Sequence, residues 1–197
     1  MVGRIIILPM HNVLKTFHGL ATVLILFVAI TLAGCVILPL SKEEMNTPAL
    51  KNIHAAFART VTQALNDPNE NWTSGWLGNM WVNYHEDRQR GLCYQWKYRV
   101  HAGVKKAVHA EGWELTGIVI NEGVKHEHHA VVVYDPKRIT ADKLLKATPR
   151  QPVYILDAWR QGQPDIYHMA DWLQLPAEVT VAAKLIEVVG DEIPVPH

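Results

Sequence analysis

The sequence predicts an α+β domain in which helices precede a small antiparallel sheet. Between residues 48 and 112, apolar side chains recur at the spacing of amphipathic helices. After Gly112 they gather instead in short β-branched or aromatic runs that are bounded by turn residues. Helices first and strands later are typical of α+β domains with an antiparallel sheet, and not of doubly wound nucleotide-binding folds.

Three helices are expected before the sheet. Apolar side chains at helical spacing predict the first over residues 48–66, where an Asn-Asp-Pro-Asn turn ends it. A second helix is expected over residues 76–88. The third should begin at Cys93, directly after Gly91 breaks the chain, and end near residue 112.

Three strands are expected in the second half of the chain, at the runs LTGIVI, AVVVY and VYIL, which occupy residues 115–120, 130–134 and 153–156. A short helical insertion opened by a threonine cap is expected over residues 140–147. Two further helices, over residues 166–174 and 177–187, complete the prediction.

The first 34 residues have the order of an export signal. Their only charges are Arg4 and Lys15, and the apolar run 19–34 ends in Leu-Ala-Gly before Cys35. The word LAGC resembles the lipobox of bacterial lipoproteins, which implies cleavage before Cys35, a lipid on its sulfur, and a membrane-anchored protein of the bacterial cell envelope. We therefore expect a signal peptide over residues 1–34, a tether over 35–47 and one domain over 48–197.

Two alternatives to this N-terminus stay open. The stretch from residue 19 to residue 40 contains no charge, so an uncleaved membrane helix is possible. Translation starting at Met10 would give a more usual signal peptide and the same mature chain.

Composition excludes several function classes. Lys and Arg number 19 and so do Asp and Glu, so the chain lacks the basic excess of a nucleic-acid-binding protein. It contains no glycine-rich phosphate loop, so no nucleotide cofactor is expected. His126 and His128 could share one strand face and bind a metal, but no motif of fixed spacing supports a metal site.

Cys93 is the only thiol that remains once Cys35 is lipidated. A cysteine at a helix start meets free backbone amides and the positive end of the helix dipole, which favour a thiolate. His129 opens the strand AVVVY and would supply a base, and Asp157 ends the run VYILD and would hold the imidazole. The sequence thus predicts a triad of Cys93, His129 and Asp157.

These three motifs resemble the core of the transglutaminase-like superfamily of papain-fold cysteine enzymes, and in particular its bacterial cysteine peptidases. The similarity runs over residues 76–160 through Gly-Leu-Cys, His-Ala before an apolar strand, and Leu-Asp. It implies a papain-like core with the nucleophile helix packed on a small antiparallel sheet. By the same resemblance Cys93 is the nucleophile, His129 the general base and acid, and Asp157 the orienting carboxylate.

The resulting hypothesis is an exported, lipid-anchored cysteine hydrolase that needs no cofactor and cleaves amide bonds of a protein or peptide in the envelope. The Cys93 backbone N–H would open the oxyanion hole, with Gln89 or Asn83 as the second donor. The alternative is an envelope lipoprotein that uses the same fold as a binding or scaffold module. In that case Cys93 is a small core residue and Asp157 caps a turn.

Overall fold

The structure is a computed structural model that describes residues 37–75, 78, 89–124, 126–174 and 182–189. The chain divides into two compact units, Met1–Val36 and Ile37–His197, and every described residue belongs to the second. The expected signal peptide, Cys35 and, apart from Gly78, the helix expected over residues 76–88 lie outside the described residues. Within those ranges, no helix has the length and apolar character needed to cross a membrane.

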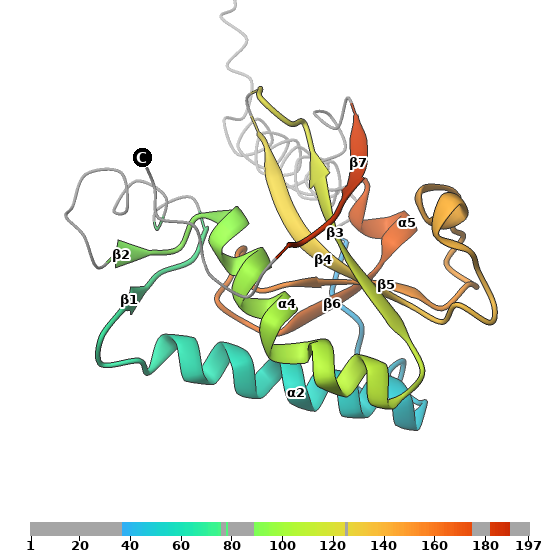
Figure 1. The fold of residues 1–197 in the computed structure, drawn as a ribbon, viewed down its shortest axis with the longest axis horizontal. Coiled ribbons are helices and arrows are strands. Elements are labelled where there is room, and N and C mark those ends of the chain that lie inside the picture. Colours follow the sequence, from blue (N-terminus) through green and yellow to red (C-terminus); the bar gives the residue numbers. More distant parts are fainter. Residues whose placement is uncertain (1–36, 76–77, 79–88, 125, 175–181, 190–197) are drawn as a thin grey trace, which may run out of the picture. The chain divides into compact units, whose positions relative to one another are not determined.

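A five-stranded antiparallel sheet, in the order β6-β5-β4-β3-β7, organises the unit (Figure 1). Its central strands confirm the three that were expected. The α+β class is therefore confirmed. The strands are β3 Glu114–Ile120, β4 His128–Tyr134, β5 Val153–Asp157, β6 Asp165–His168 and β7 Ala183–Ile186.

The two helices expected at the end of the chain are corrected. Residues 165–168 form β6 on the free edge of β5, and only α5, Met169–Trp172, is helical. Residues 183–186 form β7 on the free edge of β3. The backbone N–H and C=O groups along the outer edges of β5 and β3 need hydrogen-bond partners. Pairing with these edges therefore outweighs the weak helical spacing of the apolar residues in the two segments.

Helix α2, Pro48–Leu65, confirms the first expected helix to within one residue. Pro48 occupies the first turn, and the Thr47 hydroxyl accepts the Leu50 N–H at 3.2 Å as an N-cap. Helix α4, Cys93–Ala110, confirms the helix expected at Cys93. The two helices touch at Gly103, where a Cβ atom would overlap the side chain of Thr60.

The sheet has a different cover on each face. On one face α2 and α4 pack against alternate residues of β4 and β5, such as Val131 and Leu156. On the other face α5 and the 3-10 helix η1, Ala141–Lys146, cover Val132 and Ile155. Short parallel strands β1, Asn71–Trp72, and β2, Gln89–Arg90, pair just before α4.

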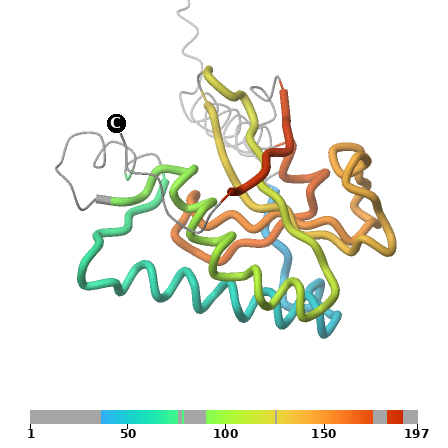
Figure 2. Tube along the Cα trace, in the orientation of Figure 1, coloured from blue at the N-terminus to red at the C-terminus, as the bar shows by residue number. Residues whose placement is uncertain are grey.

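Chain direction brings the start of α4 and the start of β4 together. Helix α4 ends where β3 begins, β3 runs back along it, and β4 starts where β3 ends (Figure 2). Because β5 is antiparallel to β4, β5 ends at the same end of the sheet. The positions of Cys93, His128 and Asp157 at element ends therefore converge.

Candidate functional site

The sulfur of Cys93 lies against the start of β4. Its S–H points to the Glu127 carbonyl oxygen at a sulfur-to-oxygen distance of 3.9 Å. The Gln95 side chain fixes this first turn of α4, because its oxygen accepts the N–H groups of Gly91 at 2.9 Å and Leu92 at 3.1 Å. Cys93 is a free thiol with only 7 % of its surface exposed.

The pKa of the Cys93 thiol is raised to about 11. Burial is the largest cause and the carboxylates of Asp157 and Glu127 add to it, whereas backbone hydrogen bonds from His129 and Tyr94 lower the pKa. The thiolate expected from the helix start is therefore corrected, since desolvation outweighs the helix dipole and the backbone amides. At neutral pH the group is a protonated thiol. Any nucleophilic chemistry at this sulfur requires a base that removes the proton.

The partner of Asp157 is His128, which corrects the expected pairing with His129. His128 Nε2 lies 2.7 Å from Asp157 Oδ2, and both side chains are at most 5 % exposed. The strand register gives the reason. Ile155 pairs with Val132, so Asp157, two residues further on, shares a sheet face with the even-numbered residues of β4.

The buried carboxylate of Asp157 accepts several hydrogen bonds. Besides His128, its Oδ2 accepts Trp172 Nε1 at 2.9 Å and Arg160 Nε at 3.2 Å, and its Oδ1 accepts the Trp159 backbone N–H at 3.1 Å. Burial opposes ionisation, but the charges and hydrogen bonds of His128, Arg160 and Trp172 together lower the pKa of Asp157 to about 2. The carboxylate is therefore ionised at every pH at which the protein is expected to work.

An ionised Asp157 fixes the tautomer of His128. Nε2 must carry the hydrogen that Asp157 accepts, so neutral His128 has its lone pair on Nδ1. Nδ1 is buried and has no hydrogen-bond partner among the described residues. The rings of Trp159 and Trp172, with centroids 4.7 and 5.5 Å from the imidazole, hold it in place. Nδ1 is thus an oriented proton acceptor.

His129 has a different carboxylate. Its Nε2 lies 2.7 Å from Glu127 Oε1, and the two side chains are 11 % and 36 % exposed. Burial lowers the pKa of His129, although Glu127 opposes this, and the imidazole lies 6.4 Å from the Tyr94 ring, centroid to centroid. Two histidine-carboxylate pairs therefore flank the stretch of β4 that touches Cys93: the buried pair of His128 and Asp157 on the α5 face, and the surface pair of His129 and Glu127 on the α4 face. The Nδ1 atom of His129 is, like that of His128, buried and without a hydrogen-bond partner among the described residues.

The remaining site expectations have mixed outcomes. Gln89 begins β2, whereas Asn83 lies outside the described residues. His126 precedes β4 with a φ of 67° and does not share a strand face with His128. In the described part of the chain, no three His, Cys, Asp or Glu side chains gather closely enough to hold a metal ion.

Sequence reasoning chose His129 over His128, and it missed Arg160 and Trp172. His128 stood beside the chosen residue, but the choice between adjacent histidines depends on a register that a single sequence does not contain. Arg160 follows the Asp-Ala-Trp turn and gave a local signal, because an arginine three residues after a buried aspartate can reach it. Trp172 gave no signal, since it lies fifteen residues away on a helix of one turn.

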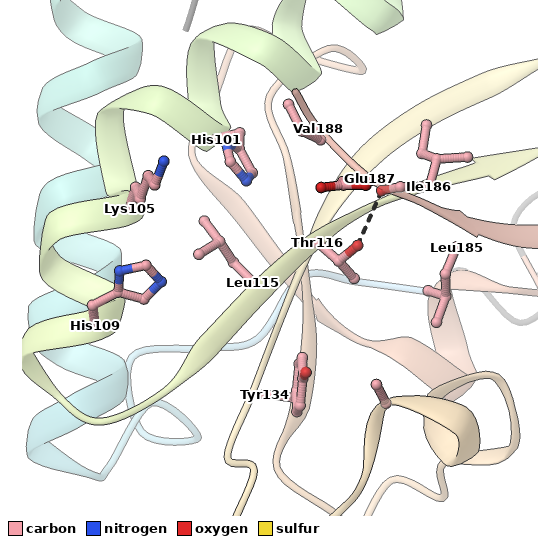
Figure 3. Close-up of a pocket in the computed structure, with 11 residues that line it drawn as sticks. His101, Lys105, His109, Leu115, Thr116, Tyr134, Leu185, Ile186, Glu187 and Val188 are labelled. Atoms are coloured by element: carbon pink, nitrogen blue, oxygen red, sulfur yellow. Dashed lines mark hydrogen bonds between the residues drawn. The ribbon is translucent and has the colours of Figure 1, made fainter. Parts of the chain in front are cut away.

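A separate groove of about 480 Å³ lies between α4, β3 and β7 (Figure 3). His101, Lys105 and His109 line it from one stripe of α4, opposite Leu185–Val188. His101 lies eight residues after Cys93, which is about 12 Å along a helix. The groove is therefore distinct from the Cys93 site.

Asp165, directly across the strands from Asp157, gives a test of this electrostatic arrangement. Burial, and then the charge of Asp157, raise the pKa of Asp165 to about 6. Because the pKa of this carboxyl is higher in the folded than in the unfolded protein, the folded protein loses stability as the pH rises from about 4, the unfolded pKa, to about 6. Asp165→Asn should therefore stabilise the protein at pH 7, by about 1 kcal/mol after allowance for partial solvation, and have little effect near pH 4. Thermal melts at both pH values check this, and equal effects at both would contradict it.

Comparison with known proteins finds no matching family model, no matching curated protein and no matching solved structure. The case for a function therefore rests on the geometry of the Cys93 site.

Proposed function

We propose that the chain is an exported cysteine hydrolase of transglutaminase-like type, with Cys93 as nucleophile, His128 as general base and Asp157 as orienting carboxylate. The observation that carries the proposal is the buried 2.7 Å hydrogen bond between Asp157 and His128 at the strand end against which Cys93 packs. A helix-start thiol, an imidazole and a carboxylate in this order are the parts that nucleophilic acyl transfer requires.

In the proposed reaction, His128 Nδ1 takes the proton of the Cys93 thiol as the sulfur attacks an amide carbonyl carbon. The tetrahedral intermediate collapses when the C–N bond breaks, and the His128 imidazolium gives its proton to the leaving amine. A water molecule, deprotonated by the same Nδ1, then hydrolyses the thioester and restores the thiol. Because the thiol pKa is about 11, the thiolate forms only as His128 accepts the proton.

His128 is preferred to His129 as the base for two reasons. Its carboxylate partner is 1 % exposed, so the charge that stabilises the imidazolium acts in a low dielectric, whereas Glu127 is 36 % exposed and screened by water. The Asp157 charge also acts on Cys93 more strongly than the Glu127 charge does. His128 lies on the sheet face that α5 covers and Cys93 belongs to α4 on the other face, so the proposed proton transfer takes place around the starting end of β4.

The burial of Cys93 favours a second candidate function, a binding module without thiol chemistry. A thiol that is 7 % exposed and has a pKa of about 11 is also what a core cysteine would show. In that case the groove between α4, β3 and β7 would be the ligand site.

Acylation of Cys93 separates the two functions. The wild-type protein should release one equivalent of nitrophenolate from p-nitrophenyl acetate at pH 7 and gain one acetyl group on Cys93, because His128 assists the attack. Alkylation by iodoacetamide should be slow at pH 7 and accelerate toward pH 11, since it depends on the preformed thiolate. Intact mass and peptide mapping check both reactions.

The control for this test is Cys93→Ala, which should melt within about 1 kcal/mol of the wild type and remain unacylated. A wild-type protein that gains no acetyl group on Cys93 and releases nitrophenolate no faster than Cys93→Ala at pH 7 would exclude the hydrolase and leave the binding module.

We also propose that Cys35 carries a lipid that anchors the protein in the bacterial cell envelope, on the strength of the LAGC word at the end of the apolar run. Cys35→Ala should block processing, so that the precursor keeps its full mass and gains no lipid when it is expressed in a bacterium with lipoprotein maturation. Mass spectrometry of the membrane fraction checks this. Normal processing of the variant would instead support another type of cleaved signal, whereas a wild-type chain that keeps its full mass would support the membrane-helix alternative.

A further inference from the structure

Trp172 touches both members of the buried pair. Its indole N–H donates to Asp157 Oδ2 at 2.9 Å, the same oxygen that accepts from His128, and its ring centroid lies 5.5 Å from that of the imidazole. The side chain is fully buried and belongs to α5, a helix of four residues that directly follows the edge strand β6. A region fifteen residues beyond Asp157 thus reaches back to the site.

We propose that Trp172 is a positioning residue of the Cys93–His128–Asp157 triad, whose indole N–H fixes the carboxylate oxygen that orients His128. This inference rests on the proposed hydrolase function. Together with the Trp159 backbone N–H on Oδ1, the Trp172 bond leaves the carboxylate a single rotamer, so the acceptor for His128 has a fixed direction.

The same contact adds to the interactions that keep Asp157 charged, of which those with His128 and Arg160 lower the pKa of Asp157 more. The titratable groups that face this carboxylate are His128 from β4, Arg160 from the turn after β5, and Asp165 and Tyr167 from β6. Asp165 repels its negative charge, whereas Arg160, His128 and the Trp172 N–H stabilise it. A carboxylate that stays ionised stabilises the imidazolium formed when His128 accepts a proton.

Trp172→Phe tests the inference, because it removes the N–H donor and keeps an aromatic ring in the core. Trp113→Phe is the matched control. Trp113 is also buried, but it packs in the core between the sheet and helices α2 and α4, stacked on Tyr154. At neutral pH, acylation of Cys93 by p-nitrophenyl acetate should be about tenfold slower in Trp172→Phe, as expected for loss of a hydrogen bond to a charged group. The acidic limb of its pH profile, which reports the titration of the coupled His128–Asp157 pair, should move to higher pH, because a carboxylate that has lost a donor holds the proton of the pair more tightly. Trp113→Phe should keep the wild-type rate and profile.

A wild-type rate and pH profile in Trp172→Phe would overturn the inference. Should Trp172→Phe fail to fold, site-specific replacement of Trp172 by benzothienylalanine removes the N–H from an indole-sized ring, and the same outcomes apply. If the wild type itself is not acylated, the hydrolase proposal fails, and a ¹³C titration of the Asp157 carboxyl decides the contact alone. Its pKa should rise in the Trp172 variant and stay unchanged in Trp113→Phe, and an unchanged value in both would reject the contact.

Discussion

His128→Ala is expected to slow the acylation of Cys93 by about 10²- to 10⁴-fold, the contribution of a positioned general base. The cause is the proton on a thiol whose pKa is about 11, because in the proposed reaction Nδ1 of His128 removes it. His129→Ala removes the neighbouring imidazole, whose carboxylate partner is solvated, and should leave the rate within roughly twofold. Burst kinetics with p-nitrophenyl acetate at pH 7 measure both rates.

The pair Asp157→Asn and Glu127→Gln repeats this comparison at the carboxylates. An amide at residue 157 no longer stabilises the imidazolium and presents a donor to Nε2, so the rate should fall about as far as in His128→Ala. Glu127→Gln should behave like His129→Ala. If the large losses fall on His129 and Glu127 instead, the surface pair is the catalytic one and the buried pair only supports the fold.

The elements that sequence reasoning predicted best are those with a strong local signal. α2 has a threonine cap, a proline in its first turn and a buried stripe, and β3 and β4 are apolar runs between turns. β6 and β7 were missed because their strand character comes from the edges of β5 and β3, which are formed by residues far away in the chain. A single sequence does not contain that pairing.

The site followed the same division. Cys93 could be identified because Gly91 breaks the chain and a helical stripe begins at Cys93 itself. Asp157 could be identified because a carboxylate at the end of an apolar strand needs a partner. Which histidine supplies it depends on the pairing of Val131 with Leu156, and the burial that raises the Cys93 pKa depends on the packing of α4 against β4. Both arise only in the folded chain.

Gly91→Ala is expected to destabilise the protein by about 3 kcal/mol and to displace Cys93 from β4. Gly91 has a φ of 148°, which side chains rarely adopt, and a Cβ atom there would overlap the Thr73 hydroxyl and lie 2.8 Å from the Thr73 carbonyl oxygen. The Gly91 N–H also donates to Gln95, so a shift of this residue moves the first turn of α4 and the sulfur at its start. The control is Gly112→Ala, at a φ of 71° with nothing within 4 Å of the added Cβ, which should cost only about 1 kcal/mol. Chemical denaturation gives the two free energies of unfolding, and acylation measured well below the midpoint should be impaired in Gly91→Ala alone. Equal costs at the two glycines would show that the close approach to Thr73 does not constrain the start of α4.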